Sequence, residues 1–133
     1  MAIKDFLVTT LYHEVWINAP RKTVYDAIST PEGVSKWWDE QTECHTDHGL
    51  IWEHSPGPEH GIVKFKILER CRQERVLWEC VSTHKVGVPG HAWTGTKISF
   101  ELEDRADHPP ANRKWCESIP FKTVLLFRHE GWP

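Results

Sequence analysis

Histidine is the residue type in this chain whose number and spacing most invite chemistry, since the sequence holds nine of them. Cys44, His45 and His48 lie close together, with His54 and His60 nearby, which makes a metal site the first hypothesis to weigh. On a strand, His45 and His48 would point to opposite faces, and no other pair has zinc-site spacing such as Cys-x-x-Cys or His-x-x-x-His. We therefore expect surface histidines, no metal site and no cofactor.

Acid–base catalysis needs only one or two titratable groups in a dry pocket, and residues on strands could supply them. His13, Glu53 and Glu79 lie on predicted strands, and His129 belongs to the segment that closes the last one. Strand alternation places about half of all side chains in water, so an outward orientation is the better expectation for each. The chain has no Gly-x-Ser-x-Gly motif, no Walker loop and no cysteine in a catalytic context. The catalytic residues are therefore unknown, and whether the chain is an enzyme stays uncertain.

Two short helices are predicted after the first strand. Pro20 suits a first helical turn, because its missing N–H would have no intrahelical partner there. An apolar stripe at i, i+3 and i+4 follows, formed by Val24, Ala27 and Ile28. Thr30 and Pro31 then repeat the start signal, with a capping hydroxyl before a proline. Because a proline pushes the residue before it out of the helical region, the sequence predicts two helices instead of one.

Alternation of apolar and polar residues predicts strands elsewhere in the chain. The expected strands cover residues 11–17, 43–45, 50–53, 63–67, 76–81, 98–102 and 121–127. A run of antiparallel strands with the helices gathered near one end of the chain indicates an α+β fold. The sheet must curl, because two short helices cannot cover the apolar face of a sheet of this length.

The inward face of this sheet is predicted from the same alternation. Val63, Phe65, Ile67, Ile98, Phe100 and Leu102 should face inward, joined by Trp52, Trp78, Leu125 and Phe127. Trp37 and Trp38 are harder to assign: one should anchor the second helix to the sheet, and the other should reach the mouth of a cavity. An inward apolar stripe is the same whether it encloses a ligand or only its neighbours, so composition alone favours ordinary packing of the eight tryptophans.

The composition limits the partners of the protein. A net charge of −3 without runs of like charge gives no support to nucleic-acid binding. The mean hydropathy is −0.53 and no apolar run is long enough to cross a bilayer, so we expect no membrane insertion. The first residues lack the pattern of a signal peptide. The four scattered cysteines are expected to be reduced, although Cys71 and Cys80 flank a predicted hairpin and could face each other. A cytoplasmic protein is the expectation.

A longer pattern resembles a known superfamily. Its residues are Val15-x-Ile17-x-Ala19-Pro20, Val24-Tyr25-x-Ala27-Ile28-x-Thr30-Pro31-Glu32 and Trp37-Trp38. Three later features agree: the hairpin over residues 61–82, the segment Gly95-Thr96-x-Ile98-x-Phe100, and residues 127–132. This pattern is similar to that of the SRPBCC (START-like) superfamily, in the branch named after the activator of the heat-shock-protein-90 ATPase. The resemblance covers about residues 12–133, and it indicates fold more than activity.

The resemblance implies a helix-grip fold, in which a curved antiparallel sheet of about seven strands wraps a long C-terminal helix. In relatives that helix begins just after the residues that match His129-Glu130-Gly131-Trp132, whereas this sequence ends at Pro133. We therefore expect a single domain over residues 1–133 without the long helix. A bare concave face would be an unusually large apolar patch. A truncated chain, a natural short form or a homodimer would each account for it.

The resemblance also implies an apolar cavity, which leads to the functional hypothesis. We expect the chain to bind an apolar or aromatic small molecule, such as a lipid or polyketide, on the concave face. The predicted lining residues are Trp38, Trp52, Phe65, Ile67, Trp78, Ile98, Phe100, Leu125 and Phe127. One alternative is a co-chaperone-like interaction module that uses its surface. A second is a cyclase- or hydrolase-type enzyme that uses an inward histidine or acid, which predicts a buried group with a shifted pKa in the cavity.

Overall fold

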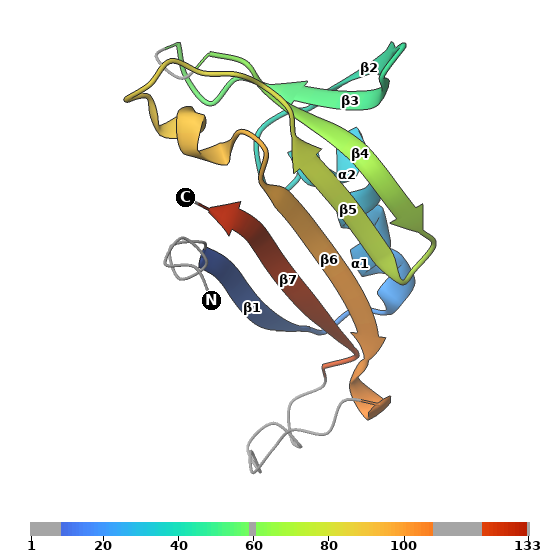
Figure 1. Cartoon of the computed structure of the whole chain (residues 1–133). Coiled ribbons are helices and arrows are strands. Elements are labelled where there is room, and N and C mark those ends of the chain that lie inside the picture. Colours follow the sequence, from blue (N-terminus) through green and yellow to red (C-terminus); the bar gives the residue numbers. More distant parts are fainter. Residues whose placement is uncertain (1–8, 59–60, 108–120, 133) are drawn as a thin grey trace.

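The computed structural model describes residues 9–58, 61–107 and 121–132. Within these ranges, seven antiparallel strands form one sheet in the order β1-β7-β6-β5-β4-β3-β2 (Figure 1). The strands are β1 (Thr9–Ile17), β2 (Thr42–Thr46), β3 (Gly49–His54), β4 (Val63–Cys71), β5 (Arg75–Cys80), β6 (Lys97–Asp104) and β7 (Thr123–Trp132). The helices α1 (Arg21–Ser29) and α2 (Pro31–Ser35) follow β1, and two short 3₁₀ helices are η2 (Pro89–Trp93) and η3 (Arg105–Asp107). This confirms the predicted α+β sheet with two short helices after its first strand.

The largest difference from the expected elements lies at the end of β7. The sequence predicts a strand over residues 121–127, whereas β7 runs from Thr123 to Trp132. The reason is tertiary: β7 lies between β1 and β6, and its polar last residues pair on both sides, with Arg128 opposite Tyr12 and Ser99. Pairing with two neighbours overrides a weak local preference for strand.

The break between α1 and α2 follows the predicted local chemistry. Thr30 has an extended backbone (φ −135°, ψ 154°), and its hydroxyl oxygen accepts a hydrogen bond from the backbone N–H of Gly33 at 3.0 Å. Gly33 also lets the two helices meet, because an ideal Cβ there would overlap the carbonyl oxygen of Asp26 and lie 2.9 Å from Cα of Ala27. The two helices therefore form one tightly packed corner.

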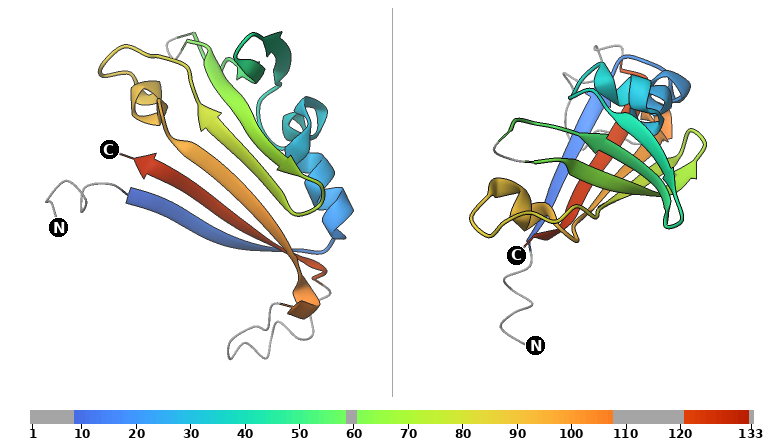
Figure 2. Two further views of the ribbon diagram at one scale, coloured as in Figure 1. Left: turned by 45° about the vertical axis from the view of Figure 1, so that its right-hand side comes forward. Right: turned by 90° about the horizontal axis from the view of Figure 1, so that it is seen from above.

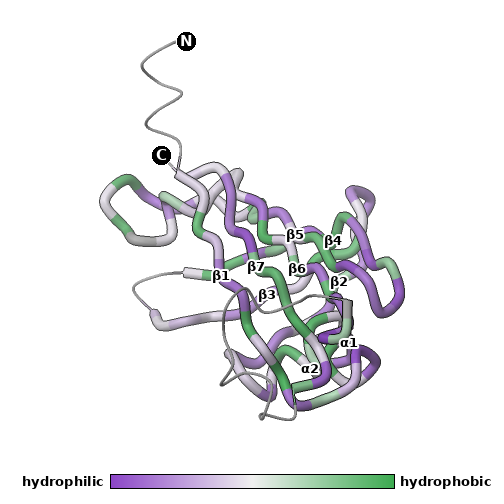
Figure 3. Tube along the Cα trace, turned by 90° about the horizontal axis from the view of Figure 1, so that it is seen from below, coloured by the Kyte–Doolittle hydropathy of each residue, from purple (hydrophilic) through white to green (hydrophobic). Residues whose placement is uncertain are grey.

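Both helices pack on the same face of the curved sheet, which we call the inner face (Figures 1 and 2). Apolar and polar residues alternate along parts of the strands (Figure 3). Because successive side chains of a strand point to opposite faces, one set packs against the helices. The core joins Val24, Ile28 and Val34 of the helices to Trp52, Val63, Phe65, Val76, Trp78, Cys80, Ile98, Phe100, Leu102 and Leu125 of the sheet. All inward positions predicted from alternation thus lie on the inner face.

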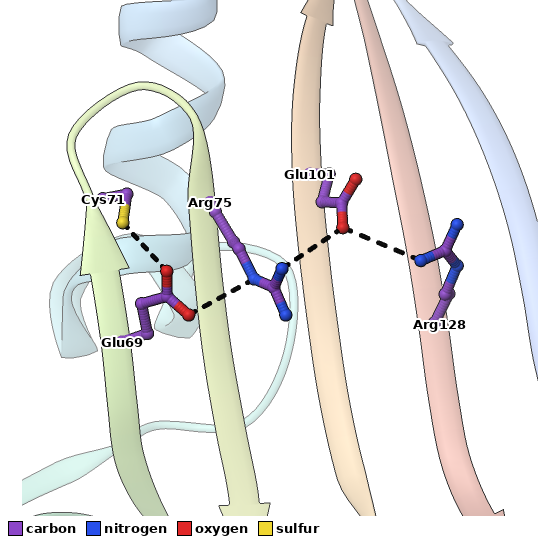
Figure 4. Close-up of polar contacts among 5 residues, drawn as sticks. All are labelled: Glu69, Cys71, Arg75, Glu101 and Arg128. Carbon is purple, nitrogen blue, oxygen red and sulfur yellow. Dashed lines mark hydrogen bonds and ion pairs between the residues drawn. The ribbon is translucent and has the colours of Figure 1, made fainter.

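The opposite, outer face carries a row of charged side chains across β4 to β7 (Figure 4). Arg75 lies 3.4 Å from Glu69 and 3.5 Å from Glu101, and Arg128 lies 3.7 Å from Glu101. These pairs are partly exposed, so each adds at most about 1 kcal/mol to stability. The row explains why these strand positions are polar, and it leaves the inner face as the place to look for a site.

The two cysteines of the β4–β5 hairpin do not face each other. Cys71 pairs with Arg75 in register and its thiol donates to the carboxylate of Glu69 at 3.0 Å on the outer face, a hydrogen bond that raises the pKa of the thiol (Figure 4). Cys80 is buried on the inner face opposite Phe65, and burial raises its pKa. The suggested approach of these two thiols is therefore wrong, because they point to opposite sides of the sheet.

Among the described residues, none of the helices combines the length and the apolar character that crossing a membrane would require.

Candidate functional site

A groove of about 400 Å³ is open on the inner face. Its walls come from β1, β5, β6, β7, the residues just after α2, and η2. The lining residues are mainly aromatic or aliphatic: His13, Val15, Trp37, Trp38, Trp78, Trp93, Ile98, Phe100, Leu125, Phe127 and His129. Volumes of this size fall in the range of small-molecule sites, which are concave and mostly apolar.

The nine lining residues predicted from sequence divide into two sets. Trp38, Trp78, Ile98, Phe100, Leu125 and Phe127 line the groove. Trp52 and Phe65, at 0 % and 1 % exposed, lie in the core beneath it, and Ile67 packs against that core at its side. Alternation identifies the face on which a side chain lies, but it does not say whether another side chain covers it. That these residues bind a ligand stays a prediction.

Trp37 and Trp38 both line the groove. The expectation that only one of the two would reach it is therefore wrong. Their rings stack with centroids 5.9 Å apart. Trp37 is half exposed, its indole N–H donates to the carbonyl of Ala27 at 2.6 Å, and its edge meets Phe100. Trp38 lies deeper and covers Phe65 with a centroid distance of 5.8 Å. The pair thus forms one wall that the helix corner holds in place.

Trp93 forms the wall near the end of β7, and no pattern in the sequence predicts this. It lies in η2, between the strands expected over residues 76–81 and 98–102. The hydroxyl of Thr96 donates to the carbonyl of Trp93 at 2.6 Å, and the backbone N–H of Gly95 donates to Cys80 at 2.8 Å. These bonds tie the turn to the sheet and place the Trp93 ring 6.3 Å from Trp38 and 4.8 Å from His129.

His129 is the polar group of the groove with the most defined geometry. It is 2 % exposed, and its Nε2 lies 2.8 Å from the hydroxyl oxygen of Thr96. Because that hydroxyl gives its own hydrogen to Trp93, it accepts from His129, and Nε2 must carry the ring hydrogen. Burial lowers the pKa of His129 from 6.5 to about 4, so the ring is neutral near pH 7. Its Nδ1 then presents a lone pair.

The electrostatics of the groove are otherwise simple. No aspartate, glutamate, lysine or arginine is among its described lining residues, and its titratable groups are His13 and His129. His54 lies just below, 4.8 Å from Trp38 by ring centroids, and burial lowers its pKa as well. None of the described lining residues therefore carries a side-chain charge that could balance an ionic group in the groove.

The four strand residues considered for catalysis divide evenly. Glu53 lies 3.7 Å from Lys64 on the outer face, and Glu79 is in register with Lys66 and Lys97 on that same face. The outward expectation is therefore correct for both glutamates. It is wrong for His13 and His129, which line the groove.

A signal for one of the two inward histidines was present in the sequence. His129 follows Leu125 and Phe127 at steps of two residues, and these residues were already assigned to the inner face. His13 shares its parity with Ile17 in β1 and lies opposite Phe127 in register. Extending the alternation by one step beyond Phe127 would have placed His129 inward, whereas the orientation of His13 follows only from its register with Phe127.

The histidine and cysteine residues near β2 do not gather. In the part of the chain that the structure describes, no group of three or more histidine, cysteine, aspartate or glutamate side chains could hold a metal ion. His45 is 80 % exposed beside Glu43, well away from the groove. His60 and Cys116 lie outside the described residues.

Solved structures share this fold at low sequence identity. The Aha1 dimer of Colwellia psychrerythraea aligns over 94 % of this chain and 78 % of its own, with 22 % identity and a TM-score of 0.62. Protein MLL2253 of Mesorhizobium loti aligns over the same shares with 14 % identity and a TM-score of 0.66. CalU16 of Micromonospora echinospora covers 95 % of this chain and 62 % of its own, with 14 % identity and a TM-score of 0.63.

These likenesses show that the chain shares its fold with these proteins, Aha1 of Colwellia psychrerythraea among them, as the resemblance implied. No family model and no curated protein sequence matches the chain. At these sequence identities the comparisons show only that the fold is shared, and one fold supports many functions. The function must therefore be argued from the groove itself.

Proposed function

We propose that this protein binds an apolar or aromatic small molecule in the groove of the inner face. The observation that carries the proposal is an open, aromatic-lined space of about 400 Å³ beside a fully packed core. Side chains in an ordinary core close on one another and leave few voids larger than a water molecule. Here Trp37, Val15 and His13 keep partial exposure around the opening. The arrangement is that of a binding site more than of a filled interior.

The lining accounts for the chemical class of the ligand. Aromatic rings from Trp38, Trp93, Phe100 and Phe127 offer large apolar faces. Flat aromatic molecules gain from edge-to-face and offset contacts with such rings, beyond the area that they bury. Because no ionised carboxylate or ammonium is among the described lining groups, the groove would leave a charged ligand uncompensated. A neutral aromatic or aliphatic molecule fits best.

Filling the groove with a protein side chain should abolish binding. Val15 is 42 % exposed at the edge of the groove, so Val15→Trp adds bulk there without overpacking the core. We expect the affinity for the neutral probe N-phenyl-1-naphthylamine to fall at least about tenfold, which corresponds to 1.4 kcal/mol. The measurement is a fluorescence titration of the full chain at pH 7.5.

The matched control is Val81→Trp. Val81 is 37 % exposed and lies next to buried Cys80, so that its side chain points to the outer face. This variant should bind the probe as the unchanged protein does. Equal affinity in both variants and the original chain would show that the probe does not use the groove, and absence of any saturable binding would overturn the proposal itself.

Catalysis is the second candidate, and His129 is the observation that favours it. A buried histidine with a shifted pKa in the groove is what the enzyme alternative predicts. The direction of the shift argues against a strong general base, however, because efficient bases have a pKa near the working pH, and this one lies at about 4. A neutral His129 is better suited to accept a hydrogen bond than to remove a proton, which favours binding.

The protein is also proposed to form a homodimer, with residues 1–133 acting as one domain in the cytoplasm. The support for dimerisation is that the similar Aha1 of Colwellia psychrerythraea is described as a dimer. The cytoplasm is favoured by the free thiols of Cys44, Cys71 and Cys80. Light scattering during size-exclusion chromatography should give twice the mass of 15.5 kDa. A single species of 15.5 kDa at micromolar and higher concentrations would contradict the dimer and leave the groove proposal untouched.

A further inference from the structure

We infer that the ligand of the groove is a neutral hydroxyaromatic molecule whose hydroxyl donates a hydrogen bond to Nδ1 of His129. This inference rests on the proposed function, because it names the chemical class that the same groove would select. The hydrogen bond to Nδ1, which we call the polar anchor, would be a polar contact in a groove whose other walls are mainly apolar. Three features of the site support it: the tautomer of the His129 ring, the absence of a hydrogen-bond partner for its Nδ1 among the described residues, and the lack of charged side chains around the ring.

The tautomer of His129 is fixed by a chain of hydrogen bonds. The carbonyl oxygen of Trp93 can only accept, so the hydroxyl of Thr96 gives it a hydrogen at 2.6 Å. The same hydroxyl oxygen then accepts from Nε2 of His129 at 2.8 Å. The hydrogen of a neutral imidazole is thereby held on Nε2, and Nδ1 is left as an acceptor.

Nδ1 of His129 has no hydrogen-bond partner among the described residues. Some side-chain atoms are both fully buried and without a partner, such as Nδ1 of His54 and the indole nitrogens of Trp78 and Trp132. Nδ1 of His129 is not one of them, so it is not fully buried. Because His129 is among the residues that line the groove, the proposal places Nδ1 on the groove side of the ring. Nδ1 therefore offers a lone pair in apolar surroundings, where a donor of the ligand gains more than it would in water.

The neighbouring side chains select against charge. Trp93, Trp132 and Phe127 surround the imidazole with ring centroids 4.8, 4.4 and 6.5 Å away, and none of them is ionic. A carboxylate or phenolate would place its negative charge beside the Nδ1 lone pair, in a setting that desolvates it. An ammonium ion could donate, but no carboxylate is among the described lining residues to balance it. A neutral hydroxyl on an aromatic ring meets both conditions.

Three naphthalene derivatives with one ring system test the inference. 2-Naphthol has a hydroxyl donor, 2-methoxynaphthalene has an oxygen without a donor, and naphthalene has neither. We expect 2-naphthol to bind the full chain about three- to tenfold more tightly than the other two, which is the worth of one net hydrogen bond. Isothermal titration at pH 7.5 gives the three dissociation constants.

The anchor is assigned with His129→Phe, which keeps a buried aromatic ring and removes the acceptor. In this variant 2-naphthol should lose its advantage, while naphthalene should bind as before. The control His45→Phe replaces a histidine that is 80 % exposed on β2, outside the groove, and should keep the full preference. Should His129→Phe fail to fold, nitrogen-15 spectra of the original chain decide: 2-naphthol must shift the Nδ1 resonance of His129 while Nε2 stays protonated.

The outcomes separate this inference from the proposed function. Equal affinity for the three compounds, or an unchanged preference in a folded His129→Phe variant, overturns the anchor and leaves the groove as an apolar binding site. An unmoved Nδ1 resonance at saturation by 2-naphthol also overturns it. If none of the three compounds binds, the proposed function and the inference fall together.

Discussion

Replacing Trp78 with alanine should lower the free energy of unfolding by about 3–5 kcal/mol, the usual cost of truncating a large buried aromatic side chain. Trp78 is 1 % exposed and joins three other rings of the inner face. Its centroid lies 5.5 Å from Trp52, 5.4 Å from Phe65 and 5.1 Å from Phe100. Its loss would open a cavity at the centre of the core that these rings cannot close. Urea denaturation followed by circular dichroism measures the change.

Trp37→Ala is the matched control for Trp78→Ala. Trp37 is 50 % exposed on the wall of the groove, and its truncation removes one hydrogen bond and part of an apolar contact. We expect a loss of about 1–2 kcal/mol. Equal losses in the two variants would contradict the difference in packing between Trp78, which is buried among core rings at the floor of the groove, and Trp37, which is half exposed at its wall.

Acid should destabilise the protein through His129, by up to about 3 kcal/mol between pH 6.5 and pH 4. The folded state holds the pKa of this ring at about 4 because the ring is buried, whereas an unfolded chain has the ordinary value of 6.5. Between these values the unfolded state binds the extra proton, so stability is complete above pH 6.5 and is lost as the pH falls toward 4. Below pH 4 both states are protonated and this contribution stays constant.

Urea denaturation at several pH values, with the original chain and His129→Phe compared, measures this effect. The groups that pack against the ring are Thr96, Trp93, Trp132 and Phe127, and none of them titrates in this range. His13 shares the groove, and His54 adds a similar but separate acid sensitivity because burial also lowers its pKa. His129→Phe should therefore reduce the pH dependence without removing it. An identical pH dependence in both proteins would show that His129 titrates normally.

The helix corner was the part of the fold most fully predictable from sequence. Thr30 and Pro31 act on the backbone within a few residues, so their effect does not depend on the rest of the protein. Pro20 was expected in the first turn of α1, and it lies instead just before that helix, as its N-cap. The structure shows Thr30 capping α2 with its hydroxyl, as expected. The resemblance stated from the sequence also rested largely on this stretch, and the fold it implied is shared with Aha1 of Colwellia psychrerythraea.

The inner face was predictable because side-chain alternation is a property of any strand. Phe100 and Phe127 were assigned inward from neighbours two residues away, and they lie opposite each other in register. How deeply each inward side chain is buried could not be predicted from the alternation. Trp52 and Trp38 are both inward, yet one is completely buried in the core and the other lines the groove. That difference depends on which residues from other elements cover each ring.

Trp93 could not be placed from the sequence, whereas the inward orientation of His129 follows once the last strand is extended beyond Phe127. Trp93 has no periodic pattern around it, and its position follows from bonds that form only in the folded sheet. Its carbonyl accepts from the hydroxyl of Thr96, and the backbone N–H of Gly95 donates to the carbonyl of Cys80. His129 lies in a polar segment that continues as a strand only because β1 and β6 flank it. Both residues belong to the end of the groove on which the proposed anchor depends.

The most direct test of the groove as a binding site is a nitrogen-15 NMR titration of the indole N–H groups with 2-naphthol. The account predicts saturable shifts for Trp37, Trp38 and Trp93, whose rings line the groove. Trp16 should not respond, because it alternates to the outer face, where its indole N–H donates to Glu14 at 2.8 Å. Shifts at Trp16 equal to those of the groove tryptophans, or no saturable shift at any of them, would contradict the account.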